Sequence, residues 1–133
     1  MRRILSVVGF ALLPFGAMAQ EVTPFQGVIA DQLTAFQSEN VEQAWTYASP
    51  NIQGLFGNPG RFGTMVQQGY PMVWDNARVD FLESEEVAGA IYQKVRITDE
   101  AGQQHDLMYQ MVEGSDGWRI NGVQLLPKPN IGV

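Results

Sequence analysis

Residues 88–126, "AGAIYQKVRITDEAGQQHDLMYQMVEGSDGWRINGVQLL", decide the fold of this protein. Apolar and polar residues alternate through the runs 88–98, 103–112 and 118–126, which is the period of β-strands. The intervening "DEAG" and "EGSDG" are rich in residues that form tight turns. Three strands joined by short turns predict an antiparallel meander, and the alternation at 78–83 predicts a fourth strand beside it.

The chain before this sheet has the period of helices instead. The segment "TPFQ" at 23–26 has the signature of a capped helix start, and apolar residues follow helical spacing through Phe36. Asn40 predicts the cap of a short second helix, and "NP" at 58–59 predicts the start of a further helix that ends at Gly69. Helices followed by strands predict an α+β fold, with the N-terminal helices packed on one face of a curved antiparallel sheet.

Between these helices, residues 54–63 read "GLFGNPGRFG", with a glycine at every third position. The run lacks the spacing of a phosphate-binding loop, and no strand precedes it. Gly54 and Gly57 are assigned to the linker before the helix. Gly60 and Gly63 fall in its first turns, where a glycine costs up to about 1 kcal/mol relative to alanine. We therefore expect a close approach of a neighbouring helix or sheet at these two positions.

The N-terminal residues 1–19 have the pattern of a removable secretion signal. Arg2 and Arg3 precede an apolar run at 4–15, and "AMA" follows as a small-residue cleavage site. The apolar run is shorter than the roughly 20 residues that span a bilayer, and an uncleaved anchor is the alternative. We therefore expect one exported domain at 20–133, in a bacterial periplasm.

Composition limits the partners of this domain. The chain has a formal net charge of −6 and no cysteine, and without the two N-terminal arginines the charge is −8. An acidic domain is a poor ligand for nucleic acid or for an anionic membrane surface. The exported compartment permits disulfides, but this fold does not use them.

Several motifs resemble a known family. They are "QLTAFQ", "AWTYASPNIQ", the Phe and Pro of "FGNP", "GYP", "QKVRITDEAGQ" and "DGWRINGV". Together they resemble a bacterial family of domains of unknown function, number 4864, over about residues 28–126. The element order and the closing "DGWRINGVQLL" resemble the nuclear transport factor 2-like fold, also called SnoaL-like. This resemblance implies a cystatin-like cone whose mouth is filled by N-terminal helices, and it carries no assigned activity.

Aromatic residues are the candidates for a ligand pocket. In a cone closed by helices they either fill the interior or line a cavity, and small-molecule sites are mostly apolar with a few polar groups. The tyrosines are of special interest because a buried hydroxyl needs a partner. The candidate pocket residues are Trp45, Tyr47, Phe56, Tyr70 and Tyr109.

His105 is the only histidine and, with Asp106, the candidate for catalysis. A single histidine argues against a metal site, and no cofactor is expected. Neighbouring residues of a strand point to opposite faces, so His105 and Asp106 are not expected to touch. The resemblance to SnoaL-like enzymes implies that a pocket histidine with a carboxylate can act as a general base. The alternative is a histidine at the start of a strand, near a turn.

Other polar residues have simpler interpretations. Ser49 precedes Pro50 and is expected to cap a brief turn rather than act as a nucleophile. Glu83, Glu85 and Glu86 are expected to form a solvated corner rather than the opposed carboxylates of a glycosidase.

Tyr92, Lys94 and Arg96 share one face of a predicted strand. In the resembled fold this outer face often forms a homodimer, whereas an isolated stripe is simply hydrated. Together these observations favour a non-catalytic module that binds a small apolar or amphipathic ligand or a protein partner. The alternative function is a small SnoaL-like acid–base enzyme, an isomerase or hydrolase, that uses His105.

Overall fold

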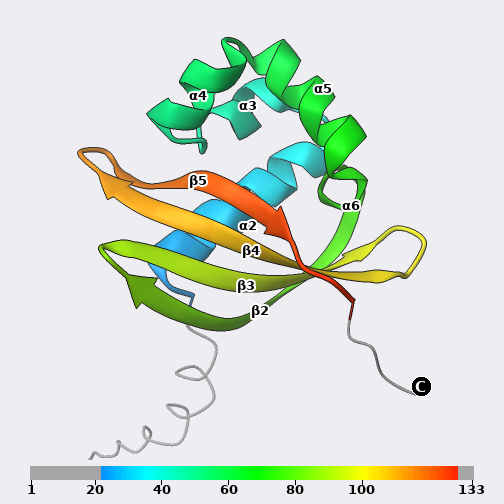
Figure 1. The fold of residues 1–133 in the computed structure, drawn as a ribbon. Coiled ribbons are helices and arrows are strands. Elements are labelled where there is room, and N and C mark those ends of the chain that lie inside the picture. The colour runs from blue at the N-terminus through cyan, green and yellow to red at the C-terminus, as the bar shows by residue number, and fades with distance from the viewer. Residues whose placement is uncertain (1–21, 129–133) are drawn as a thin grey trace, which may run out of the picture.

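The computed structural model describes residues 22–128, and the predicted secretion signal lies outside them (Figure 1). Within this range, helices come first and strands follow, which confirms the α+β prediction. The helices are α2 (Pro24–Gln37), α3 (Val41–Trp45), α4 (Pro50–Phe56), α5 (Pro59–Gly69) and α6 (Pro71–Trp74). The strands are β2 (Asn76–Val87), β3 (Ala90–Asp99), β4 (Gln104–Gly114) and β5 (Gly117–Leu125).

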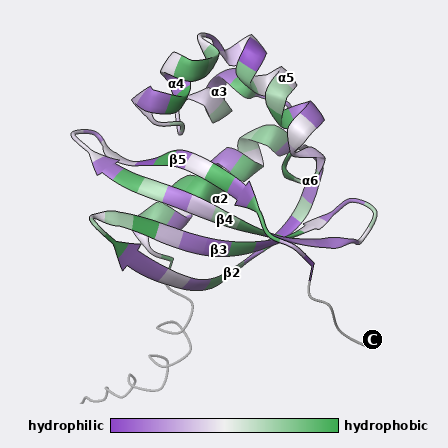
Figure 2. Ribbon diagram, viewed as in Figure 1, coloured by the Kyte–Doolittle hydropathy of each residue, from purple (hydrophilic) through white to green (hydrophobic). Residues whose placement is uncertain are grey.

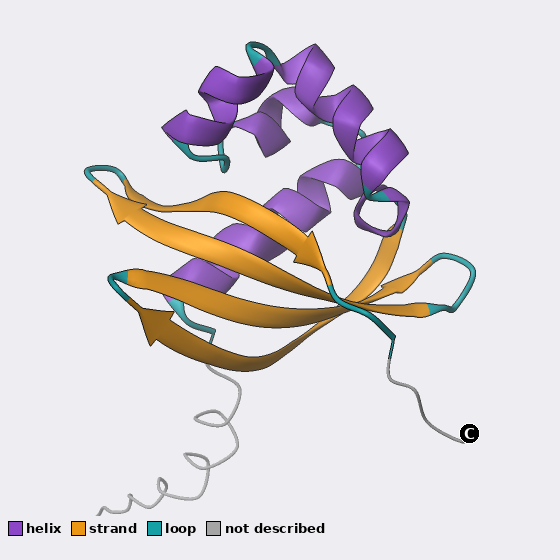
Figure 3. Ribbon diagram, viewed as in Figure 1, coloured by secondary structure: helices purple, strands orange, loops and turns teal. Residues whose placement is uncertain are grey.

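The strands form one curved antiparallel sheet in the order β2-β3-β4-β5, as the meander predicted (Figure 3). Hydrophobic and hydrophilic residues alternate along the strands (Figure 2). Strand β2 is longer than the predicted 78–83 and shifts register between Phe81 and Ser84. The glutamates Glu83, Glu85 and Glu86 are exposed to solvent as predicted, but they lie on an edge strand and not at a corner.

Two groups of helices cover the sheet differently. Helix α2 lies across one face and contacts both β2 and β5 (Figure 1). Helices α3, α4 and α5, residues 41–69, stand above the β5 edge, and we call them the helical cap. Helix α6 leads from the cap to β2, a short element that the sequence did not predict because its four residues carry no clear period.

The core lies between α2 and the inner face of the sheet. Ile29, Leu33 and Phe36 of α2 are at most 1% exposed. They pack with a row of fully buried residues on β3 and β4 that comprises Val95, Ile97, Leu107, Tyr109 and Met111. Burial of one large apolar side chain stabilises a fold by about 1.5–3 kcal/mol, so this layer holds the sheet and α2 together.

Side-chain caps define where the helices begin, as predicted. Thr23 and Gln26 form a reciprocal capping box at the start of α2, with both bonds 3.2 Å long. Asn40, Ser49 and Asn58 each accept a bond from the backbone N–H three residues ahead. Ser49 caps the seven-residue helix α4 rather than a brief turn, because the cap bond and the proline that follows both favour helix.

The glycine run has one position of close packing. A Cβ on Gly63 would lie 2.7 Å from Cγ1 of Val41, so α5 contacts α3 there as predicted. At Gly60 the prediction is wrong, since a Cβ would meet only the side chain of Asn58, at 3.3 Å. Gly54 lies inside α4 rather than in a linker, and Gly57 ends that helix with φ +86°.

Candidate functional site: a cavity under the helical cap

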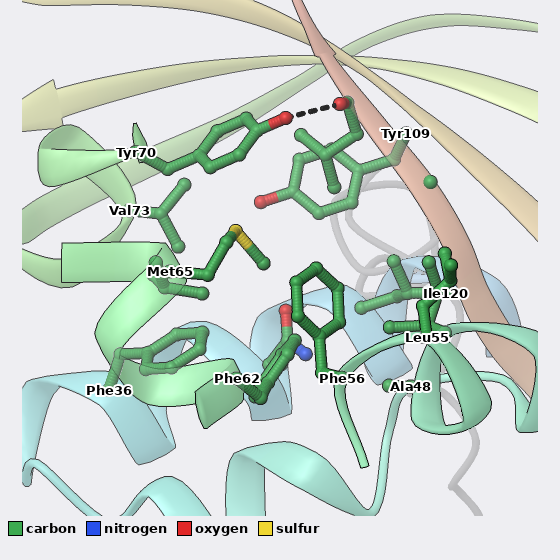
Figure 4. Close-up of a pocket in the computed structure, with 15 residues that line it drawn as sticks. Phe36, Ala48, Leu55, Phe56, Phe62, Met65, Tyr70, Val73, Tyr109 and Ile120 are labelled. Carbon is green, nitrogen blue, oxygen red and sulfur yellow. Dashed lines mark hydrogen bonds between the residues drawn. The ribbon is translucent and has the colours of Figure 1, made fainter. Parts of the chain in front are cut away.

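A cavity of about 230 Å³ lies between the helical cap, α2 and the inner face of the sheet (Figure 4). Its walls are almost entirely apolar. The lining comes from α2 (Gln32, Phe36), the loop before α4 (Ala48), α4 (Ile52, Leu55, Phe56), α5 (Phe62, Met65, Val66), the α5–α6 junction (Tyr70), α6 (Val73), β4 (Tyr109) and β5 (Ile120, Gly122, Val123). Leu55 is 70% exposed, so the α4 side of the cavity is open to solvent.

Two connections hold the cap over the sheet and leave the cavity between them. At one end the backbone N–H of Ser49 donates to the carbonyl of Ile120, and the Ile120 N–H donates to the carbonyl of Tyr47. The Ser49 hydroxyl also donates to Oδ1 of Asn121, at 2.7 Å. At the other end the Tyr70 hydroxyl donates to the carbonyl of Val123, at 2.9 Å, the dashed line in Figure 4.

Tyr109 is the unusual member of the lining. Its side chain is 0% exposed, and within residues 22–128 its hydroxyl has no hydrogen-bond partner. The hydroxyl points into the cavity, between Tyr70 and Met65 (Figure 4). Burial, together with a smaller effect of nearby Tyr70, raises the pKa of Tyr109 above its ordinary value, so the group stays a neutral donor and acceptor.

Gln32 is the second polar group of the wall. It is 4% exposed, and its Nε2 donates to the carbonyl of Ala44 at 3.1 Å. In the described chain this is the only hydrogen bond of the Gln32 side chain, so its Oε1 keeps its acceptor capacity. Among the side chains of the lining, the Tyr109 hydroxyl and the Gln32 amide oxygen are therefore the polar atoms that form no hydrogen bond in the described chain.

The predicted pocket residues separate into two groups. Phe56, Tyr70 and Tyr109 line the cavity, whereas Trp45 and Tyr47 do not. Trp45 packs behind the wall, edge-on to Phe62 with ring centroids 5.6 Å apart. The Tyr47 hydroxyl accepts a bond from Gln43 at an exposed position.

The sequence did not single out the remaining lining residues, and two of them matter most here. Ile52 and Leu55 lie on a helix that was expected to be a brief turn, so their common face was not visible. Gln32 is a polar residue of the first helix, and nothing in the sequence marks it as buried. The available signal for a cavity was that α4 and α5 carry more apolar residues on one face than the core under α2 requires.

His105 lies outside the cavity and takes part in a turn. Its Nε2 is 2.9 Å from Oδ2 of Asp99, whose Oδ1 accepts the backbone N–H groups of Ala101 and Gln103. The hydrogen bond with His105, followed by that with the Gln103 backbone, lowers the pKa of Asp99. A general base at His105 would therefore act at the β3–β4 turn and not in the cavity.

The outer face of the sheet satisfies its own polar groups. Asp106 accepts two bonds from the guanidinium of Arg96, at 2.8 and 3.0 Å. This bonding with Arg96 lowers the pKa of Asp106. Tyr92 accepts a bond from Gln110 on the same face. Asp106 and His105 thus bond in different directions, as their neighbouring positions on a strand predict.

Neither a metal-binding cluster nor a membrane-spanning helix is found within residues 22–128. No group of three His, Cys, Asp or Glu residues between 22 and 128 is placed to hold a metal ion. No helix in that part of the chain is long and apolar enough to cross a membrane.

Fold and cavity together define a small α+β domain with an apolar interior site under a helical cap. The chain belongs to the family described as Domain of unknown function (DUF4864), whose model matches residues 18–133. No curated protein matches the sequence.

Proposed function

We propose that the protein binds a small apolar molecule with a hydrogen-bonding group in the cavity under the helical cap. The observation that carries this proposal is the Tyr109 hydroxyl, which is fully buried, points into the cavity and has no partner in the described chain. A buried polar group without a partner costs about 1–3 kcal/mol. A ligand oxygen or nitrogen at this position removes that cost and gains a hydrogen bond.

The size and chemistry of the cavity limit the ligand. The volume of about 230 Å³ exceeds the roughly 150 Å³ of an engineered cavity that binds benzene. A ring with a short substituent, or a short alkyl chain, is the matching size. The lining contains no carboxylate, amine or guanidinium, so the part of the ligand inside the cavity is uncharged.

The proposed cellular location and fold family of this binding protein have support in the sequence and in the order of its elements. The signal pattern at 1–19 supports an exported protein of the bacterial periplasm. The order of elements, with N-terminal helices over a curved sheet, supports membership of the nuclear transport factor 2-like folds. Binding without catalysis agrees with a cavity wall that lacks His105 and Asp106.

Calorimetric titration with 3-phenyl-1-propanol tests this proposal. The wild-type protein should bind it, and Tyr109→Phe should weaken binding about two- to tenfold, the contribution of one hydrogen bond. Ile52→Trp fills the cavity from α4 and should abolish binding. Val87→Trp enlarges an exposed apolar residue on β2 and serves as the control. Equal affinity of the Ile52→Trp variant and the wild-type protein would contradict the proposal.

A further inference from the structure

The segment that covers the cavity carries almost no charge. Residues 43–74 include α4, α5 and α6 and contain one charged residue, Arg61. All 14 acidic residues of the chain lie outside this segment. The ligand site of this acidic protein is therefore covered by a surface that is neutral except for one cation.

Arg61 differs from the basic residues of the sheet. Arg78, Lys94, Arg96 and Arg119 each lie within 4 Å of a carboxylate. Within residues 22–128, Arg61 forms no ion pair, and its guanidinium forms no hydrogen bond. Residues 22–128 thus supply an anionic partner for each basic residue of the sheet and none for Arg61.

Arg61 also lies beside the cavity. A shallow hollow on the outside of the cap is lined by Phe56, Arg61, Thr64, Met65, Gln68 and Gly69. Phe56 and Met65 line both this hollow and the cavity, so the two spaces share a wall. Arg61 is an exposed residue, so a ligand that extends from the cavity past Phe56 and Met65 enters a hollow that Arg61 lines.

We propose that Arg61 binds the anionic end of the ligand. The ligand is then an amphipathic carboxylate whose uncharged part lies in the cavity and carries the group that bonds to Tyr109. This inference rests on the proposed binding function and adds the class of ligand. The planar guanidinium offers two parallel donors that match a carboxylate. The one positive charge of Arg61 balances a monoanion better than a doubly charged phosphate ester, whose second charge the net charge of −6 would repel.

The acidic character of the whole protein does not prevent this contact. Exposed charges are screened beyond about 8 Å at physiological ionic strength. The carboxylates nearest in sequence to the uncharged segment are Glu42 and Asp75, which flank it. Attraction to Arg61 is the electrostatic contribution that the inference requires, and it weakens as salt is added.

A matched pair of ligands tests the inference. We would titrate 3-(4-hydroxyphenyl)propionate and 3-(4-hydroxyphenyl)-1-propanol, which share the phenol ring and chain and differ in charge, into the wild-type protein at pH 7.5 and low salt. The phenol hydroxyl can bond to Tyr109 in both compounds, so the pair differs only at the end that would meet Arg61. The carboxylate should bind about two- to fivefold more tightly than the alcohol, the range of an exposed ion pair. Arg61→Gln should bring this ratio close to one, and Arg61→Lys should keep part of it. Arg78→Gln changes the net charge equally at an exposed site on β2 and should leave the ratio unchanged.

The outcomes separate the two proposals. If Arg61→Gln binds both compounds with the wild-type ratio, the role of Arg61 is overturned while the binding function stands. If the wild-type protein prefers the alcohol, the carboxylate class is wrong. If the wild-type protein binds neither compound, the binding function fails and this inference fails with it.

Discussion

Gln93 and Tyr109 are partners across strands β3 and β4, and they differ in one respect. Both are polar, both are 0% exposed and both lie on the inner face of the sheet. Gln93 bonds to Gln26 of α2 through Oε1 and donates through Nε2 to the carbonyls of Leu82 and Lys94. The hydroxyl of Tyr109 has no partner in the described chain.

The difference separates two regions of the interior. Under α2 the described chain supplies a partner for both polar atoms of the Gln93 side chain, as folded proteins generally do. Under the helical cap the chain leaves a buried hydroxyl and an empty volume side by side. The same sheet gives Gln93 a full set of hydrogen-bond partners and gives the neighbouring Tyr109 hydroxyl none. We therefore interpret the unpaired hydroxyl as part of a ligand site.

The largest effect on stability is expected from removing the hydrogen bonds of the Gln93 side chain. Gln93→Leu keeps the size of the side chain but leaves Gln26 and two carbonyls without their bonds. We expect it to lower the free energy of unfolding by about 2–4 kcal/mol, since each orphaned buried group costs about 1–3 kcal/mol. Urea denaturation measures the change. Gln110→Leu removes two side-chain hydrogen bonds, with Tyr92 and Asn121, at a partly exposed position and should cost less than Gln93→Leu; equal losses would contradict the contrast.

The next largest effect on stability is expected at the contact between α5 and α3 in the helical cap. Gly63→Ala places a Cβ 2.7 Å from Val41, so α5 must move away from α3. We expect a loss of about 1–3 kcal/mol, the usual cost of overpacking, and a lower Tm by differential scanning calorimetry.

A rescue variant separates this clash from a general loss of helix stability. Val41→Ala removes both methyl groups and should restore much of the stability when combined with Gly63→Ala. Gly54→Ala, where a Cβ meets no atom within 4 Å, should not lower the Tm. A Gly63→Ala protein as stable as the wild type would mean that the cap is loosely packed.

Much of this fold was predictable because its signals are local. The turns "DEAG" and "EGSDG" and the alternation between them define three strands without knowledge of the rest of the chain. The caps at Thr23, Asn40 and Asn58 work through bonds to residues three positions away. The length of β2 was not predictable, because pairing with β3 extends it through a run of glutamates that has no strand period.

The site was less predictable because it depends on distant contacts. Phe56, Tyr70 and Tyr109 were selected as aromatic residues, and the sequence does not distinguish them from Trp45, which packs behind Phe62. The missing partner of Tyr109 is a property of the whole fold. The sequence shows that Arg61 is the one charged residue of segment 43–74, but it does not show that Arg61 lies beside the cavity.

Acid should weaken the charged sheet rather than the helical cap, in which Glu42 is the only carboxylate. Bonding to Arg96 lowers the pKa of Asp106 below its unfolded value of about 3.9. The ion pair therefore contributes stability above that pH, and this contribution is lost as pH falls through the lowered pKa. Asp106→Asn should lower the Tm by no more than about 5 °C at pH 6, because the pair is partly exposed.

The pH dependence of that difference is the test. The gap in Tm between wild-type protein and Asp106→Asn should shrink as the pH is lowered below 4. Asp31→Asn removes an exposed carboxylate of α2 that forms no ion pair within residues 22–128, and its Tm should stay within a degree or two of wild type. A gap for Asp106→Asn that stays constant from pH 6 to pH 3 would show that the effect is not ionic.

The smallest effect on stability, and the most informative one, is expected at Tyr109. Tyr109→Phe removes a buried hydroxyl that has no partner to lose, so the free energy of unfolding should stay the same or rise by up to about 1 kcal/mol. Tyr70→Phe is the matched control, because its hydroxyl bonds to the carbonyl of Val123 and its loss should cost about 0.5–1.5 kcal/mol. If Tyr109→Phe is instead as destabilising as Tyr70→Phe, the hydroxyl already has a partner in the unliganded protein. The contrast between Gln93 and Tyr109 would then not indicate a ligand, because both sides of the interior would be satisfied.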